Sequence, residues 1–147
     1  MFSQRIKDVM ERKKLLTAPP ETTVRQAAKL MAKRKVGAVM VVEDGRLVGI
    51  FTERDAVARV LARDRDARTA RLADVMTPAP QTVGPDRSFG YALLMMHDNG
   101  YRHVPVVENG KLIGIVSARN ALDPDLEEFV AESRRRDQIL RERAAAA

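Results

Sequence analysis

Two short motifs in the chain place a polar side chain three residues after a hydroxyl side chain: Thr52 with Asp55, and Ser117 with Asn120. Each motif follows a glycine-led apolar run, so it is expected where a strand ends and a helix begins. In that place the two side chains can cap free N–H groups of the first helical turn. A carboxylate there can instead accept hydrogen bonds from the two hydroxyls of a ribose, while the positive helix end attracts a phosphate. Capping alone would explain both motifs, although aspartate is less suited than Glu or Gln to close a capping box.

Both motifs belong to an internal duplication, which organises the rest of the chain. Residues 41–55 match residues 106–120 at an offset of 65 positions, and Asp-Val-Met occurs at 8–10 and again at 74–76. Self-similarity at a fixed offset indicates two copies of one supersecondary unit. The chain of 147 residues is therefore expected to form one compact unit of two half-domains.

The elements that must position the motifs are clearest in the first copy. The spacing of apolar residues predicts an amphipathic helix over 24–34, after a capping box. Strands over 38–42 and 47–51 are expected around a tight turn at Asp44-Gly45. A second helix, after the second strand, is expected to bury Val57, Val60 and Leu61.

The second copy repeats this plan after a linker over 62–71 that is rich in alternating Arg and Asp. Its hairpin turn is expected at Asn109-Gly110, which is again a dipeptide that suits positive φ angles. The apolar face of its first helix is expected to carry Phe89, Ala92, Leu93 and Met96.

The last part of the chain lies outside the duplication. Asp123-Pro124 is a favourable start for a helix, which is expected to run to about Arg143 and to leave a frayed end over 144–147. Its apolar residues could form one stripe, made of Leu126, Phe129, Val130 and Leu140. Two alternatives stay open for this stripe: contact with a second subunit, or docking against the rest of the chain.

Taken together, the duplicated frame, the Asp-Val-Met starts, the glycine-led hydroxyl motifs and the run Arg102–Val107 resemble a tandem pair of cystathionine-β-synthase (CBS) domains, a Bateman module, over roughly residues 8–121. The resemblance implies an α+β fold in which two duplicated β-α-β-β-α halves pack about a pseudo-twofold axis, with a C-terminal helix added. The implied bounds are 8–62 for the first CBS domain, 63–73 for a linker, 74–122 for the second CBS domain and 123–143 for the helix.

The resemblance also implies a ligand site between the halves, where the hydroxyl motif of one half faces early strand residues of the other. One site would bind an adenine nucleotide (AMP, ADP or ATP) as a regulatory ligand, and no cofactor would be required. Its residues would be Thr52, Asp55, Thr82, Val83, Arg102, His103 and Val104. A second site would involve Thr17, Val39, Ser117 and Asn120. This second site is expected to be degenerate, because Asn120 is neutral and because Gly37 and Ala38 stand at the positions that match Arg102 and His103.

The charge of the chain leaves a second function class open. The net charge is +6, and because residues 121–147 hold seven acids and five arginines, residues 1–120 carry about +8. Such a surface favours anionic partners, either a phosphorylated small molecule or nucleic acid. Only 4% of the residues are aromatic, which argues against a stacking platform for single strands. A dimerisation module that has lost its ligand is a third alternative.

Composition argues against several other functions. The chain has no cysteine and two histidines, which leaves little for a metal site and none for a thiol nucleophile. It has no glycine-rich phosphate loop and no recognisable catalytic motif, so it is not expected to be an enzyme. No run approaches the length of a membrane span, so a cytoplasmic protein without membrane contact is expected. The resemblance implies a homodimer, and any target is expected to be a separate, unknown protein.

Overall fold

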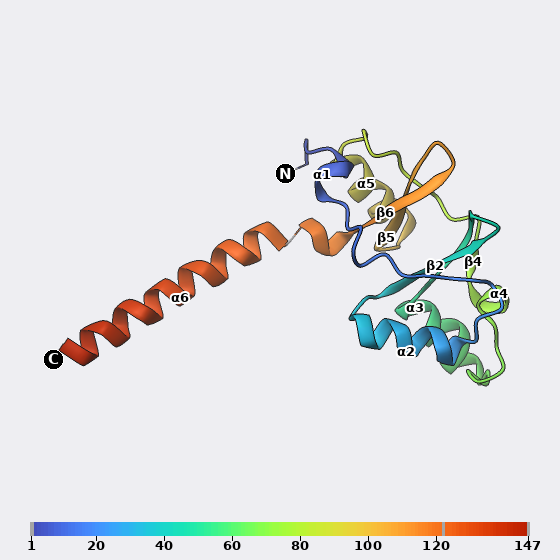
Figure 1. Ribbon diagram of the computed structural model, residues 1–147, viewed down its shortest axis with the longest axis horizontal. Coiled ribbons are helices and arrows are strands. Elements are labelled where there is room, and N and C mark those ends of the chain that lie inside the picture. Colours follow the sequence, from blue (N-terminus) through green and yellow to red (C-terminus); the bar gives the residue numbers. More distant parts are fainter. Residues whose placement is uncertain (1, 122, 147) are drawn as a thin grey trace.

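A computed structural model of the chain describes residues 2–121 and 123–146, without the side chains of residues 123–127 and 130. Two α+β halves lie against each other, and a long helix projects away from them (Figure 1). The α+β fold with two duplicated halves and a C-terminal helix, predicted from the sequence, is confirmed.

The first half is a four-stranded sheet covered by helices. Helix α2 begins after a capping box at Thr23, and the hairpin turns at Asp44 and Gly45, both of which have positive φ. The sheet order is β1-β2-β3-β4, with β1 parallel to β2 and the other pairs antiparallel. The elements from this part of the chain are β1 (Thr17–Ala18), α2 (Val24–Arg34), β2 (Ala38–Glu43), β3 (Arg46–Thr52), α3 (Glu53–Asp55), a π-helical turn η1 (Ala56–Val60) and a 3-10 turn η2 (Leu61–Arg63).

The second half repeats the helix and the hairpin of the first, but its sheet has two strands, β5-β6, and only the isolated bridges Val83–Val106 and Glu11–Ile115 stand where the first half has β1 and β4. Its elements are α5 (Phe89–Asn99), β5 (His103–Glu108), β6 (Lys111–Ser117) and a 3-10 turn η3 (Ala118–Ala121). The β5–β6 hairpin even repeats the register shift of the β2–β3 hairpin, between Val106 and Val107 in place of Val41 and Val42. Its last element is only a 3-10 turn, where the first half has a longer run of helical turns over 53–63.

Each copy of the duplication begins with a short lead-in that packs on the other half. Helix α1 (Ile6–Val9) precedes the first half, yet Ile6 is buried in the core of the second half beside Phe89. Helix α4 (Leu72–Val75) and strand β4 (Thr77–Pro78) precede the second half, yet Leu72 is buried in the core of the first. In Figure 1, α1 accordingly lies beside α5, and α4 contacts β3 of the first half. The two halves therefore complete each other.

The backbone hydrogen bonds of the two lead-ins follow the same repeat. The N–H of Ile6 donates to Arg87 O at 2.8 Å, and the N–H of Leu72 donates to Thr22 O at 2.8 Å. The next residue in each lead-in donates to a proline carbonyl, Lys7 to Pro85 at 2.9 Å and Ala73 to Pro20 at 3.0 Å. Pro20 and Pro85, which match each other at the offset of 65 positions, thus mark the places where each half receives the lead-in of the other.

A glycine and a methionine pack together at each of these exchange points. A Cβ added to Gly49 would overlap Sδ of Met76, and a Cβ added to Gly114 would come within 2.9 Å of Sδ of Met10. Neither methionine belongs to the same copy as its glycine. The Asp-Val-Met starts and the glycine-led motifs are therefore partners in packing across the two halves.

The prediction for the helix after Thr52 is partly wrong. Val60 is buried as expected, but Val57 and Leu61 are exposed, by 59% and 71%. The chain changes here from a single α-turn to a π-helical turn and then to a 3-10 turn. Because those turns differ in residues per turn, the spacing of an α-helix does not place these three side chains on one face.

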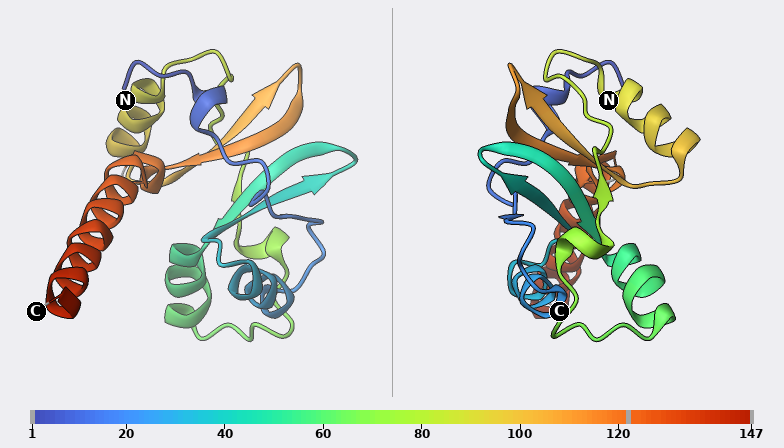
Figure 2. Two further views of the ribbon diagram at one scale, coloured as in Figure 1. Left: turned by 60° about the vertical axis from the view of Figure 1, so that its left-hand side comes forward. Right: turned by 90° about the vertical axis from the view of Figure 1, so that its right-hand side faces the viewer.

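Helix α6 (Asp123–Ala146) extends away from both halves (Figures 1 and 2). The side chains of Phe129 and Leu140 are exposed, so the alternative in which they dock on their own module is not seen. The other two members of the expected stripe, Leu126 and Val130, lie outside the described side chains. The expected fraying over 144–147 is not seen for residues 144–146, which stay helical; alanine has the highest helix propensity. Within the described residues, no helix combines the length and apolar character needed to cross a membrane.

Candidate functional site

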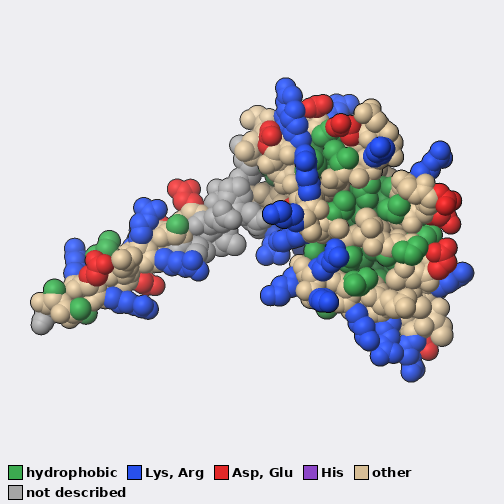
Figure 3. All heavy atoms as spheres, in the orientation of Figure 1, with side chains coloured by type: hydrophobic (Ala, Val, Ile, Leu, Met, Phe, Trp, Pro, Cys, Tyr) green, Lys and Arg blue, Asp and Glu red, His purple; other side chains and the backbone are tan. Residues whose placement is uncertain are grey.

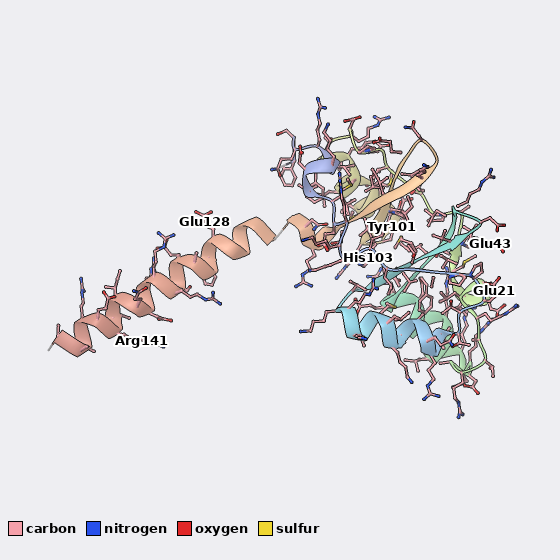
Figure 4. The ribbon with its side chains drawn as sticks, viewed as in Figure 1. Glu21, Glu43, Tyr101, His103, Glu128 and Arg141 are labelled. Atoms are coloured by element: carbon pink, nitrogen blue, oxygen red, sulfur yellow. The ribbon has the colours of Figure 1, made fainter. Side chains whose placement is uncertain are left out.

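Two clefts lie where the halves meet. The first has a volume of about 670 Å³ and the second about 630 Å³. Both are lined by Gly37, Glu53, Arg102 and His103, so the clefts adjoin along one set of side chains. Figure 4 shows His103 and Tyr101 at this boundary between the two halves. Both clefts lie between the halves, which is where the resemblance implies a ligand site.

The first cleft brings together four of the seven residues predicted for it. Thr52 and Asp55 stand at the end of β3 and in α3, in the first half. Arg102 and His103 stand at the start of β5, in the second half. An acidic side chain from the first half and two basic side chains from the second half therefore line one cleft.

The carboxylate of Asp55 makes both capping and charged contacts. Its Oδ2 accepts from the Thr52 N–H at 2.9 Å and from the Thr52 hydroxyl at 3.1 Å, while the Asp55 N–H donates to Thr52 Oγ1 at 3.3 Å. Aspartate therefore closes the capping box, although glutamate or glutamine was expected to suit that role better. Capping uses only one carboxylate oxygen. Its Oδ1 lies 3.6 Å from Nε of Arg59, and because an ionised carboxylate offers about four lone-pair sites, it can still accept from a ligand.

Arg59 ties this carboxylate to the start of the second copy. Its guanidinium donates to the carbonyl oxygens of Val75 at 3.2 Å and of Met76 at 2.9 Å. These are carbonyls at the end of α4, which has no further helical turn to satisfy them. The position of Asp55 is therefore coupled to the lead-in that packs on the first half.

Three other residues predicted for the first cleft do not line it. Val83 and Val104 are buried in the core of the second half, and Thr82 is exposed outside the cleft wall. Thr77, Gln81 and Tyr101 line the cleft in their place. The Tyr101 hydroxyl donates a hydrogen bond to Oε1 of Gln81. Sequence reasoning missed these three. Thr77 could have been found as the residue directly after the second Asp-Val-Met motif.

The surroundings of His103 favour its neutral form. Burial lowers its pKa from the ordinary value of 6.5, and the nearby charge of Arg102 lowers it further, while Glu53 and Glu11 act in the opposite direction. Gly37 allows the close approach: a Cβ there would overlap Oε1 of Glu53 and lie 3.3 Å from His103 Nε2. A neutral imidazole can donate one hydrogen bond and gains a second on protonation.

Arg102 is a charged side chain that lines both clefts. Its guanidinium makes no hydrogen bond or ion pair with the part of the chain that the structure describes. The matching position in the first half is Gly37, so the pseudo-twofold arrangement carries this charge only once. An arginine that both clefts share is suited to bind the phosphate group of a ligand in either of them.

The second cleft brings together two of the four residues predicted for it. Ser117 and Asn120 line it, whereas Val39 is buried in the core of the first half and Thr17 lies on the exposed edge strand β1. Glu11, Lys14, Lys35 and Arg119 line it as well, and the sequence alone had not pointed to them. Within the described residues no group of three metal-binding side chains occurs.

The comparisons with known proteins agree with this architecture. The sequence model of the CBS domain matches residues 6–62 and 72–125. The chain is 35% identical over 126 residues to the mitochondrial CBS domain-containing protein CBSX3 of Arabidopsis thaliana, across 78% of this chain and 61% of that protein. It thus spans less than two thirds of that relative's length.

Solved structures show the same fold. An uncharacterized conserved protein from Pyrococcus horikoshii matches with a TM-score of 0.79 and 29% identity, over 85% of this chain and 94% of its own. The CBS domain pair of protein MJ0100, solved with 5′-methylthioadenosine and S-adenosyl-L-methionine, matches with a TM-score of 0.75 and 24% identity, over 85% and 98%. Because the family match covers well over half of the chain, in the two copies that the structure shows, the chain belongs to the CBS domain family and carries a pair of these domains.

Proposed function

We propose that this CBS domain pair is a regulatory module that binds an adenine nucleotide in the first cleft and has no catalytic activity of its own. One observation supports this most directly. Asp55 from one half, and Arg102 and His103 from the other, line the same cleft of about 670 Å³. That cleft offers an acceptor for hydroxyls at one wall and donors for phosphate at the other.

The chemistry of the cleft suits the three parts of a nucleotide. Oδ1 of Asp55 can accept from a ribose hydroxyl while Oδ2 keeps the capping bonds to Thr52. Arg102 and His103 can bind the phosphate, and bound phosphate would favour the protonated imidazole. Ile50, Pro80 and Tyr101 give apolar surface for a base in the same cleft. AMP, ADP and ATP share these parts, so all three belong to the proposed ligand class.

The neighbouring structure of MJ0100 supports the ligand class only at the level of the fold. At 24% identity its bound adenosyl compounds are facts about that protein. They do show that a CBS pair of this shape can hold an adenosine group. The proposal for this chain therefore rests on its own cleft.

Isothermal titration with AMP, ADP and ATP tests the proposal. Hydrogen bonds to a charged group contribute about 1.5 to 3 kcal/mol, so Asp55→Ala should weaken binding to the first cleft about tenfold or more. Asp55→Asn serves as a second variant, since the amide oxygen can keep the capping bonds. Asp98→Ala, which removes an exposed carboxylate outside the cleft, is the matched control. Affinities that are equal in all three variants and the wild type would refute the assignment.

Salt dependence separates this function from nucleic-acid binding. Phosphate-backbone contacts release counterions, so affinity for duplex DNA or RNA would fall steeply with salt and would not be displaced by nucleotide. Figure 3 shows that Lys and Arg side chains occur over much of the visible face, which by itself does not select a partner. Saturable nucleotide binding that depends on Asp55 would decide for the regulatory module.

We also propose that the module is a homodimer. Val57 and Leu61 after the first sheet, and Tyr91 and Leu94 on α5, are exposed. The right-hand view of Figure 2 shows α5 and the turns over 53–63 on the same side of the molecule. Leu61→Glu should therefore convert a dimer to a monomer in light scattering, whereas Phe129→Glu on α6 should leave the mass unchanged. An unchanged mass for Leu61→Glu would place the interface elsewhere.

A further inference from the structure

The second cleft contains a carboxylate where the sequence motif lacks one. Oδ1 of Asn120 accepts from the Ser117 N–H at 2.7 Å and from the Ser117 hydroxyl at 3.3 Å. These are the same two bonds that Oδ2 of Asp55 accepts from Thr52. Asn120 thus keeps the capping half of the role of Asp55. Its other atom, Nδ2, is a donor, and it donates to Oε1 of Glu11 at 3.1 Å.

Glu11 is held firmly in this place by its backbone. Its N–H donates to Ile115 O at 2.9 Å, and the N–H of Ile115 donates to Glu11 O at 3.1 Å, which fixes the residue on strand β6. The side chain is 28% exposed, and its Oε2 lies 3.9 Å from Nζ of Lys14. Glu11 is the last residue of the lead-in that packs on the second half, so it reaches this cleft only through the exchange between halves.

The first cleft has the reverse arrangement. The residue at the position of Glu11 is Thr77, which follows the second Asp-Val-Met motif and lines the first cleft. In the first cleft the acid is on the helix turn and the neutral residue is on the lead-in. In the second cleft the neutral residue, Asn120, is on the turn and the acid is on the lead-in. Each cleft therefore has a carboxylate beside its hydroxyl motif.

We propose that Glu11 is the hydroxyl-binding carboxylate of the second cleft, and that this cleft binds a nucleoside polyphosphate. The inference rests on the proposed function, and it replaces the expectation that this site is degenerate. The cationic lining decides the phosphate length. Lys14, Lys35 and Arg102 line the second cleft besides Arg119, whereas Arg54 and Arg102 line the first; two carboxylates line each. The greater positive charge favours the more highly charged ligand.

Titration with ATP tests this inference in the chain of 147 residues. The wild type should bind two ATP per chain. Glu11→Ala should weaken one event about tenfold or more and leave the other, while Asp55→Ala should do the converse. Glu11→Gln keeps an acceptor for Asn120 and so preserves local structure, yet it should weaken the same event. Glu43→Gln, at an exposed hairpin position outside both clefts, is the matched control.

A ligand variant gives an independent readout. With 2′-deoxy-ATP, the event that depends on Glu11 should weaken in the wild type, and Glu11→Ala should cause no further loss. One ATP per chain, abolished by Asp55→Ala, would refute the inference and leave the proposed function standing. Two events that are both unaffected by the Glu11 variants would refute it as well. No binding by the wild type would refute the proposed function itself.

Discussion

The packing of Gly49 against Met76 yields a quantitative prediction for Gly49→Ala. Gly49 lies in β3, where it pairs with Val41 on one side and Pro78 on the other. A Cβ on this residue would overlap Sδ of Met76 and would lie 2.9 Å from its Cγ and 3.1 Å from its Cε. Three atoms of one side chain would have to move, and Met76 is partly buried against the core of the first half.

The expected loss of stability combines two opposing effects. Inserting a methyl group into a packed interior costs about 1 to 3 kcal/mol. Replacing glycine by alanine also restricts the unfolded chain, which returns about 0.4 to 1 kcal/mol. The net destabilisation of Gly49→Ala should therefore be about 1 to 2 kcal/mol. For a chain of this length, each kcal/mol lowers the unfolding temperature by about 2 to 4 °C.

Urea and thermal unfolding measure this loss, with Gly84→Ala as the matched control. Gly84 has nothing within 4 Å of an added Cβ, so its substitution should be neutral or slightly stabilising. In the double variant with Met76→Ala the overlap disappears, so the two losses should be less than additive by about 1 kcal/mol. The reasoning is refuted if Gly49→Ala is as stable as Gly84→Ala, or if the two losses simply add.

Two further predictions concern Arg59, which pairs with Asp55, and His103, which lines the first cleft. Arg59→Ala should lower the free energy of unfolding by about 1 to 2 kcal/mol, because the carbonyls of Val75 and Met76 lose their donor. Arg59→Lys should recover only part of this loss, since an ammonium lacks the forked geometry of a guanidinium. Equal stability of the three proteins in urea would contradict this. His103 makes the free energy of unfolding depend on pH, because its pKa is lower in the folded chain than in the unfolded chain. Its contribution to stability is fully present above the unfolded pKa of about 6.5. That contribution is lost as the pH falls from there towards the folded pKa. His103→Gln should flatten the rise in unfolding free energy between about pH 5 and 7, and an unchanged slope would show that other groups cause it.

Local structure followed closely from the sequence. The periodicity after Thr23 predicted α2 over 24–34, which is the helix observed. The dipeptides Asp44-Gly45 and Asn109-Gly110 predicted two hairpin turns, and all four residues have positive φ. These features depend on residues close together in the chain. The spacing signal failed over 56–63, where the turns are not α-helical.

The composition of the clefts followed less well, for a physical reason. The residues that line a cleft depend on which segments cross between the halves. A repeated sequence does not show that the lead-in of one copy packs on the other copy. Thr77 and Glu11 were therefore missed. Val83 and Val104 were expected to line a site because they lie early in the strand region of the second copy. Their side chains point instead into the core of the second half.

The exchange of lead-ins also bears on how such a chain could arise. A single repeat carries a lead-in whose buried side chain, Ile6 or Leu72, fills a core that is not its own. Two separate copies could complete both cores by the same reciprocal exchange, which amounts to a domain-swapped dimer. Gene duplication would then only have to join the end of one copy to the start of the next, through residues 63–71. Within one chain, the link makes the exchange intramolecular, so that neither core depends on the concentration of a second chain.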